Sequence, residues 1–219
     1  MSIEKVIIPD YSRKEETFNA LSHILGTLVA LTVFVFGLIK LINQEISLFY
    51  FFGLLIFAIT AFLVYLISAT YHYLDKDKYL KKVFRIIDHC TIYLLIAGTY
   101  TPICFVLMTT HVIGLIMLII EWSGAIIGII LKAFFFDKKV ARVIAFFLYI
   151  IMGWLTLYTG GFLYIPTTCF VFVLVGGITY TIGSILYALG HKNTRFHCIF
   201  HVFVLMSTIL QTIGIFFLF

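Results

Sequence analysis

The 219-residue chain is 63% apolar and only 11% charged, with a mean hydropathy of +1.13. This composition excludes a soluble globular protein. The formal net charge of +5 does not require a nucleic-acid partner, because membrane topology and contact with anionic lipid account for the basic residues. We expect one domain, 1–219, that is almost wholly embedded in a membrane, with residues 1–20 as a cytoplasmic N-terminal segment.

Seven apolar stretches of about 20 residues follow one another, each long enough to cross a hydrocarbon core of ~30 Å as an α-helix. We expect them at residues 22–42, 47–70, 85–107, 112–131, 140–160, 166–188 and 197–218. The joints between them, such as 191–195, are too short to hold a soluble domain. A β-barrel strand would alternate apolar and polar residues, whereas 112–120 is almost continuously apolar. The predicted fold is an all-α integral membrane bundle of seven transmembrane helices.

Basic residues lie almost entirely on one side of this predicted bundle. If the N-terminus is cytoplasmic, all lysines and arginines except Lys40 lie on the cytoplasmic side. Such an asymmetry follows the positive-inside rule. The sequence therefore predicts a cytoplasmic N-terminus and, with seven spans, a C-terminus on the outside.

Five polar residues lie near span ends that face the cytoplasm in this topology. They are Ser68 and His72 in the second span, Asp88 in the third, and His197 and His201 in the seventh. At 1.5 Å per residue, all five fall within about two helical turns of the inner boundary. Because hydrocarbon penalises polar groups, their meeting at one depth indicates a functional site.

The residue types in this set predict a metal centre. His197 and His201 are four residues apart, so both imidazoles lie on one helix face and can hold one ion. With His72 as a third ligand, a fourth position stays open for water, which is typical of catalytic zinc. Asp88 can accept a hydrogen bond from that water or from an imidazole, and Ser68 can reach the same oxygen. Alternatively, such a histidine pair arises by chance, and interfacial histidines often bond only headgroups and backbone carbonyls.

Other polar residues have two interpretations each. Glu15, Glu16, Asn19 and His23 form a stripe that leads into the first span. They either surround or gate the metal site, or they cap a helix whose first turn favours acidic residues. Glu121 lies in the middle of the fourth span and should face the bundle interior, where it either marks a cavity or serves the structure.

Five short motifs recur along the chain: EETFNALSH at 15–23, SATYH at 68–72, DH at 88–89, AGTYTP at 97–102 and HCIFH at 197–201. Together they resemble the hemolysin III family, the bacterial branch related to the progestin and adiponectin receptors. The resemblance covers residues 15 to 219. It implies a seven-helix bundle with an intracellular N-terminus and a zinc ion held by His72, His197 and His201. It also implies a water between the metal and Asp88, with Ser68 as the serine of the second motif.

The wider superfamily includes alkaline ceramidases, so the resemblance suggests zinc-dependent hydrolysis of lipid amides, here in a bacterial plasma membrane. For hydrolysis of a lipid amide or ester, Asp88 is the candidate general base and Ser68 the candidate stabiliser of the oxyanion. Membrane lipids and a lipid substrate are the expected partners, with no nucleic acid and no protein partner identified. The alternatives are a sensor or receptor with structural zinc, a cytolytic pore as the family name suggests, and a haem protein with two histidine ligands.

Overall fold

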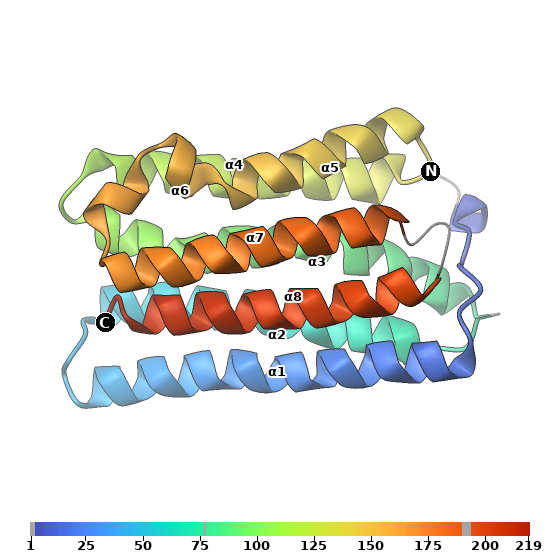
Figure 1. Ribbon diagram of the computed structural model, residues 1–219, viewed down its shortest axis with the longest axis horizontal. Coiled ribbons are helices and arrows are strands. Elements are labelled where there is room, and N and C mark those ends of the chain that lie inside the picture. The colour runs from blue at the N-terminus through green and yellow to red at the C-terminus, as the bar shows by residue number, and fades with distance from the viewer. Residues whose placement is uncertain (1–2, 77, 190–193) are drawn as a thin grey trace.

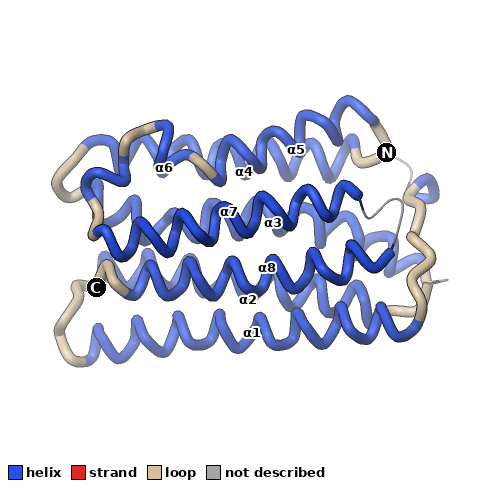
Figure 2. Tube along the Cα trace, in the orientation of Figure 1, coloured by secondary structure: helices blue, strands red, loops and turns tan. Residues whose placement is uncertain are grey.

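Figure 1 shows the computed structural model, which describes residues 3–76, 78–189 and 194–219. Within these ranges the chain is helical, with no β-strand. The long helices run alongside one another, and the loops gather at the two ends of the bundle (Figure 2). Of the predicted joint 191–195, residues 191–193 lie outside the described ranges. Helices that satisfy their own backbone hydrogen bonds are what a hydrocarbon environment requires.

Six helices of the described chain are long and apolar enough to cross a membrane. They are α1 (Arg13–Ile42), α2 (Leu48–Tyr73), α3 (Tyr79–Met108), α4 (Val112–Phe135), α7 (Thr167–Leu189) and α8 (Thr194–Phe216). Each of them contains or overlaps one of the predicted spans. The prediction of an all-helical integral membrane protein is therefore confirmed.

The fifth predicted span, 140–160, is not one continuous helix. α5 (Lys139–Gly153) ends before Trp154, and the short α6 (Leu155–Tyr158) and the 3₁₀ helix η2 (Gly161–Tyr164) continue the chain. At 1.5 Å per residue, the 15 residues of α5 measure about 22 Å, less than a ~30 Å hydrocarbon core. The described chain thus has six uninterrupted membrane-length helices where the hydropathy pattern predicts seven.

α1 begins well before its apolar stretch because a capping box starts it at the preceding polar residues. The side-chain oxygen of Ser12 accepts a hydrogen bond from the backbone N–H of Glu15 at 3.3 Å. In return, the carboxylate of Glu15 accepts one from the backbone N–H of Ser12 at 2.8 Å. The capping interpretation is therefore confirmed for Glu15, and the added turns carry Glu16, Asn19 and His23 on the same helix.

Successive helices are mostly neighbours in space, and α8 returns to lie against α1 as well as α7. The beginnings of α1, α3 and α8 and the end of α2 therefore meet at one end of the bundle, beside the N-terminal segment (Figure 1). A buried apolar core fills the bundle, with Leu54, Phe57 and Ile103 among its fully enclosed side chains. Except for Glu121 on α4, the polar residues singled out in the sequence lie on these four helices, toward the end where they meet.

Candidate metal centre

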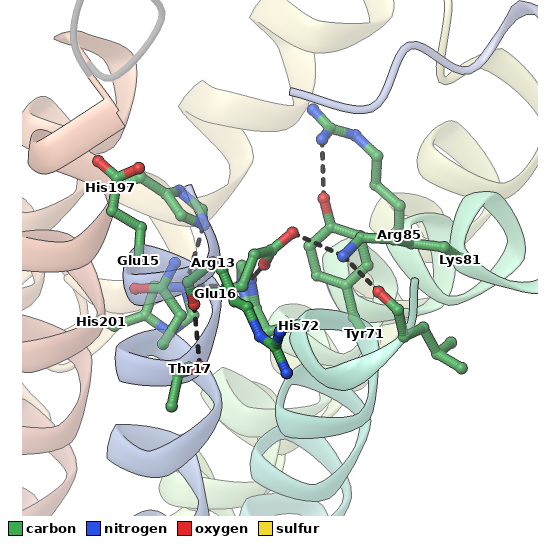
Figure 3. Close-up of polar contacts among 12 residues, drawn as sticks. Arg13, Glu15, Glu16, Thr17, Tyr71, His72, Lys81, Arg85, His197 and His201 are labelled. Atoms are coloured by element: carbon green, nitrogen blue, oxygen red, sulfur yellow. Dashed lines mark hydrogen bonds and ion pairs between the residues drawn. The ribbon is translucent and has the colours of Figure 1, made fainter. Parts of the chain in front are cut away.

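Three histidines, His72, His197 and His201, point ring nitrogens toward one another and form what we call the histidine triad (Figure 3). His72 lies near the end of α2, and the other two lie one turn apart near the beginning of α8. Nε2 of His201 is 3.2 Å from Nε2 of His72 and 3.0 Å from Nε2 of His197. All three residues are buried. The predicted convergence of these histidines is therefore present in the structure.

The spacing of the histidine triad fits a tetrahedral metal ion. Two nitrogens that each lie about 2.0–2.1 Å from a tetrahedral zinc ion are about 3.3 Å apart, close to the two observed separations. A neutral imidazole has one nitrogen with a lone pair, and facing lone pairs at this distance repel unless a proton or a cation lies between them. The buried histidine triad can therefore bind a metal ion.

Ser68 and Asp88 lie at the same end of the bundle but outside the histidine triad. Ser68 is buried on α2, one turn before His72. Its hydroxyl lies near the carboxyl group of Asp88 on α3, with which it interacts electrostatically. Within the described chain, Asp88 is not among the side chains that could together hold one ion. The structure thus links Asp88 to the second helix through Ser68 and gives it no direct place in the ligand set.

Glu16 connects the histidine triad to a buried lysine. Its Oε2 lies 2.5 Å from Nδ1 of His72, the ring nitrogen that faces away from the other histidines. Its Oε1 accepts a hydrogen bond from Nζ of Lys81 at 2.6 Å. Lys81 is only 1% exposed and also donates to the backbone carbonyl of Leu74 at 2.7 Å. Sequence reasoning missed Lys81 because a lysine at the start of a span resembles any other cytoplasmic charge.

Further rings pack against the histidine triad. Tyr11, in the segment before α1, stacks on His197 with ring centroids 4.9 Å apart and planes inclined by 21°. The ring of Tyr187, on α7, lies 5.9 Å from the same imidazole. The ring of His23 lies 4.0 Å from that of His201. No pattern in the sequence pointed to either tyrosine, because their approach depends on how distant segments pack.

The environment of Tyr11 keeps its hydroxyl protonated. Burial disfavours the charged phenolate and raises the pKa of Tyr11 well above its ordinary value, and nearby Arg85 offsets only part of this effect. The phenol is therefore a neutral donor beside the histidine triad over the physiological pH range.

The remaining polar candidates fall into two groups. Glu16 and His23 contact members of the histidine triad, as expected if the first-helix stripe surrounds that site. Asn19 is buried on the same helix. Glu121 is fully buried on α4, a helix that contributes no residue to the triad, and its carboxylate oxygens have no hydrogen-bond partner among the described residues.

Comparison with known proteins supports the resemblance seen in the motifs. Residues 11–212 match the family model described as Haemolysin-III related. The chain is 36% identical over 198 residues to a hemolysin-3 homolog of Bacillus subtilis (strain 168). The match covers 89% of this chain and 90% of that relative. It is 37% identical over 195 residues to hemolysin-3 of Bacillus cereus, and the match covers 88% of this chain and 86% of that relative. With its apolar helices, it is a multi-pass protein of the bacterial cell membrane. The chain therefore belongs to the Haemolysin-III related family.

Proposed function

We propose that this protein is a zinc-dependent hydrolase of lipid amides or esters, with its site near the cytoplasmic face of the membrane. The observation that carries the proposal is the buried histidine triad, whose Nε2 atoms have the spacing of zinc ligands. A carboxylate and a hydroxyl, from Asp88 and Ser68, lie at the same end of the bundle. Three histidine ligands leave one coordination position open, as in catalytic rather than structural zinc sites.

In the proposed topology the chain crosses the membrane seven times, with the N-terminus in the cytoplasm and the C-terminus outside. α5 and α6 together form the fifth passage, an assignment supported by their course alongside α4 in Figure 1. The basic residues support the orientation, because Lys40 alone would lie on the outer side. The histidine triad then lies within a few turns of the cytoplasmic boundary.

A zinc ion bound by the histidine triad supplies Lewis acidity. Asp88 acts as general base and takes the proton of the attacking water. In the proposed reaction the neighbouring Ser68 hydroxyl donates a hydrogen bond to the Asp88 carboxyl group and orients it. A serine hydroxyl has a single proton, so stabilising the oxyanion of the reaction requires Ser68 to turn away from Asp88. In the proposed reaction Ser68 thus donates first to Asp88 and then to the oxyanion.

The proposed substrates are membrane lipids, because the outer faces of the helices are lipid-facing. Large apolar side chains are exposed along α1 at helical spacing, as Leu21, Leu25 and Leu28 illustrate. Such surfaces are stable only in hydrocarbon. A lipid amide or ester with its polar group at the membrane boundary reaches the depth of the histidine triad without leaving the bilayer.

Elemental analysis of protein purified in mild detergent, followed by a lipid-hydrolysis screen, tests the proposal. We expect stoichiometric zinc in the wild type, no zinc in a His197→Ala/His201→Ala double variant, and a lipid product that Asp88→Asn does not release. Zinc-loaded, folded protein that is inert toward a broad lipid panel would overturn the hydrolase assignment and favour structural zinc. Wild-type protein that contains no metal when purified without chelators would overturn both the hydrolase assignment and the structural-zinc alternative.

A further inference from the structure

The two nitrogens of the His72 ring have different partners on opposite edges of the ring. Nε2 faces His201 within the histidine triad, and Nδ1 faces the carboxylate of Glu16. A carboxylate is an acceptor, so the 2.5 Å contact places the imidazole proton on Nδ1. The lone pair of a neutral His72 is then on Nε2, the atom that faces the other two histidines. The contact with Glu16 therefore selects the tautomer that a metal ligand needs.

Glu16 is itself held in place by a buried cation. Lys81 donates to Glu16 Oε1 at 2.6 Å and to the Leu74 carbonyl at 2.7 Å, and its Nζ lies 5.1 Å from the centre of the Tyr71 ring. Because Lys81 is almost fully buried, its charge needs a compensating carboxylate. Each oxygen of Glu16 thus serves one donor, with His72 on one side and Lys81 on the other (Figure 3).

We propose that Glu16 is the positioning residue of the metal centre, whose carboxylate, anchored by Lys81, orients His72 so that Nε2 points at the ion. This inference rests on the metal binding of the proposed function and assigns to Glu16 a role that the neighbouring acid does not share. Glu15 instead bonds to Ser12 and to the hydroxyl of Thr194, at 2.6 Å. The arrangement also makes α1, which supplies no ligand, part of the metal centre.

The chemistry of a carboxylate between two donors makes a specific rescue possible. In Glu16→Gln, a single amide oxygen replaces the two carboxylate oxygens that accept from His72 and Lys81. The amide N–H groups, which are donors, then face one of these two donors. In Glu16→Gln/Lys81→Met, the lysine no longer competes, so the amide oxygen can accept the proton of His72 Nδ1. A residue with a general structural role would not be rescued by removing a second buried polar group.

Zinc affinity, measured by competition with a chromophoric chelator on purified protein in detergent, tests the proposal without any activity assay. We expect Glu16→Ala to weaken zinc binding by about 10- to 100-fold, the usual effect of losing a partner of a metal-bound histidine. Glu16→Gln should weaken binding to a comparable extent, and the added Lys81→Met should restore a large part of the loss. Glu15→Ala is the matched control, with unchanged affinity. The visible spectrum of the cobalt-substituted protein should change in Glu16→Ala and not in Glu15→Ala.

Wild-type affinity and an unchanged cobalt spectrum in Glu16→Ala would overturn the role of Glu16 and leave the proposed function standing. The role of Glu16 is also overturned if Lys81→Met deepens the loss of zinc affinity in the Glu16→Gln background. Wild type that binds neither metal would overturn the proposed function and this inference together. The two failures are therefore distinguishable from the wild-type titration alone.

Discussion

Tyr11 stacks on His197, with ring centroids 4.9 Å apart, so the segment that precedes α1 closes the end of the bundle over the histidine triad. The same segment buries Val6, and Lys82 donates to the backbone carbonyl of Glu4 at 3.2 Å. The closure thus combines one ring stack, one buried apolar residue and exposed polar contacts. Because the ring stack and the exposed polar contacts are individually weak, we expect this segment to open without unfolding of the bundle.

Removing the stacked ring should speed the loss of metal from the site. Stacking of this kind contributes about 0.5–1.5 kcal/mol, so we expect Tyr11→Ala to raise the rate of zinc extraction by a chelator roughly 2- to 10-fold. Tyr11→Phe keeps the ring and should behave like the wild type. Stopped-flow mixing of zinc-loaded protein with excess chelator measures the rate. Equal rates for all three proteins would show that the segment does not limit access.

The closure should also be lost at high pH. Burial raises the pKa of Tyr11 above its ordinary value of about 10, so the closed segment holds the neutral phenol and disfavours the phenolate. The stabilisation is fully present below about pH 10 and is lost as the pH rises further. Zinc extraction should therefore accelerate above about pH 10 in the wild type. Tyr11→Phe, which has no phenol, should lack this acceleration, and an identical rise in both proteins would contradict the prediction.

Removal of the metal should lower the thermal stability of the wild type. A ligand present at about a thousand times its Kd stabilises the folded state by about 4 kcal/mol, which corresponds to roughly 10 °C in Tm for a chain of this length. We expect this difference between zinc-loaded and chelator-treated protein in a thermal unfolding assay in detergent. In the His197→Ala/His201→Ala variant the chelator should have no effect. A chelator effect of equal size in that variant would locate the metal elsewhere.

The pattern of the sequence was sufficient for part of this site. Helical periodicity alone puts His197 and His201 on one face of α8, and the order of the spans brings His72 to the same end of the bundle. Glu16 and Lys81, by contrast, are 65 residues apart, and nothing local in either segment indicates their contact. Sequence reasoning therefore placed Glu16 on a stripe near the site but did not find its partner Lys81, because that pairing depends on how α1 and α3 pack.

The break near Trp154 was missed for a related reason. Hydropathy measures only whether a stretch is apolar, and 140–160 is apolar throughout most of its length. It does not register where the backbone leaves the helix, and at Trp154 φ is −110° and ψ is 10°. The carbonyl of the preceding Gly153 instead accepts a hydrogen bond from the hydroxyl of Tyr100 at 2.8 Å. The hydrogen bond from Tyr100 of α3 therefore lies at the point where α5 ends.

Asp88 should matter for turnover and not for metal content. As general base it contributes about 10²- to 10⁴-fold to the rate, so Asp88→Asn should lower lipid hydrolysis by that factor while zinc stays stoichiometric. Ser68→Ala, which removes the hydroxyl that interacts with Asp88, should give a smaller loss. Product release from labelled lipid and elemental analysis of the same samples provide the two readouts. Loss of zinc in Asp88→Asn would instead make Asp88 a ligand.

The close contact between α1 and α2 depends on Gly26, and the residues at this contact reach the histidine triad through His23. A Cβ atom at Gly26 would overlap the ring of Tyr65. That ring packs edge-on against His23 at 5.1 Å, and its hydroxyl donates to Thr208 of α8 at 2.6 Å. Gly26 thus permits close helix packing, because the ring of Tyr65 occupies the space that a larger side chain would need.

Gly26→Ala should therefore destabilise the bundle, because the aromatic ring cannot move without breaking its contacts with two other helices. Overpacking of this kind costs about 1–3 kcal/mol, and Tm in detergent should fall accordingly. Gly153→Ala is the matched control, since a Cβ there meets no atom of the described chain within 4 Å. Zinc affinity should fall in Gly26→Ala as well, because Tyr65 packs against His23, which in turn packs against His201. Equal Tm values for the two variants would contradict the proposed support of the site by this contact.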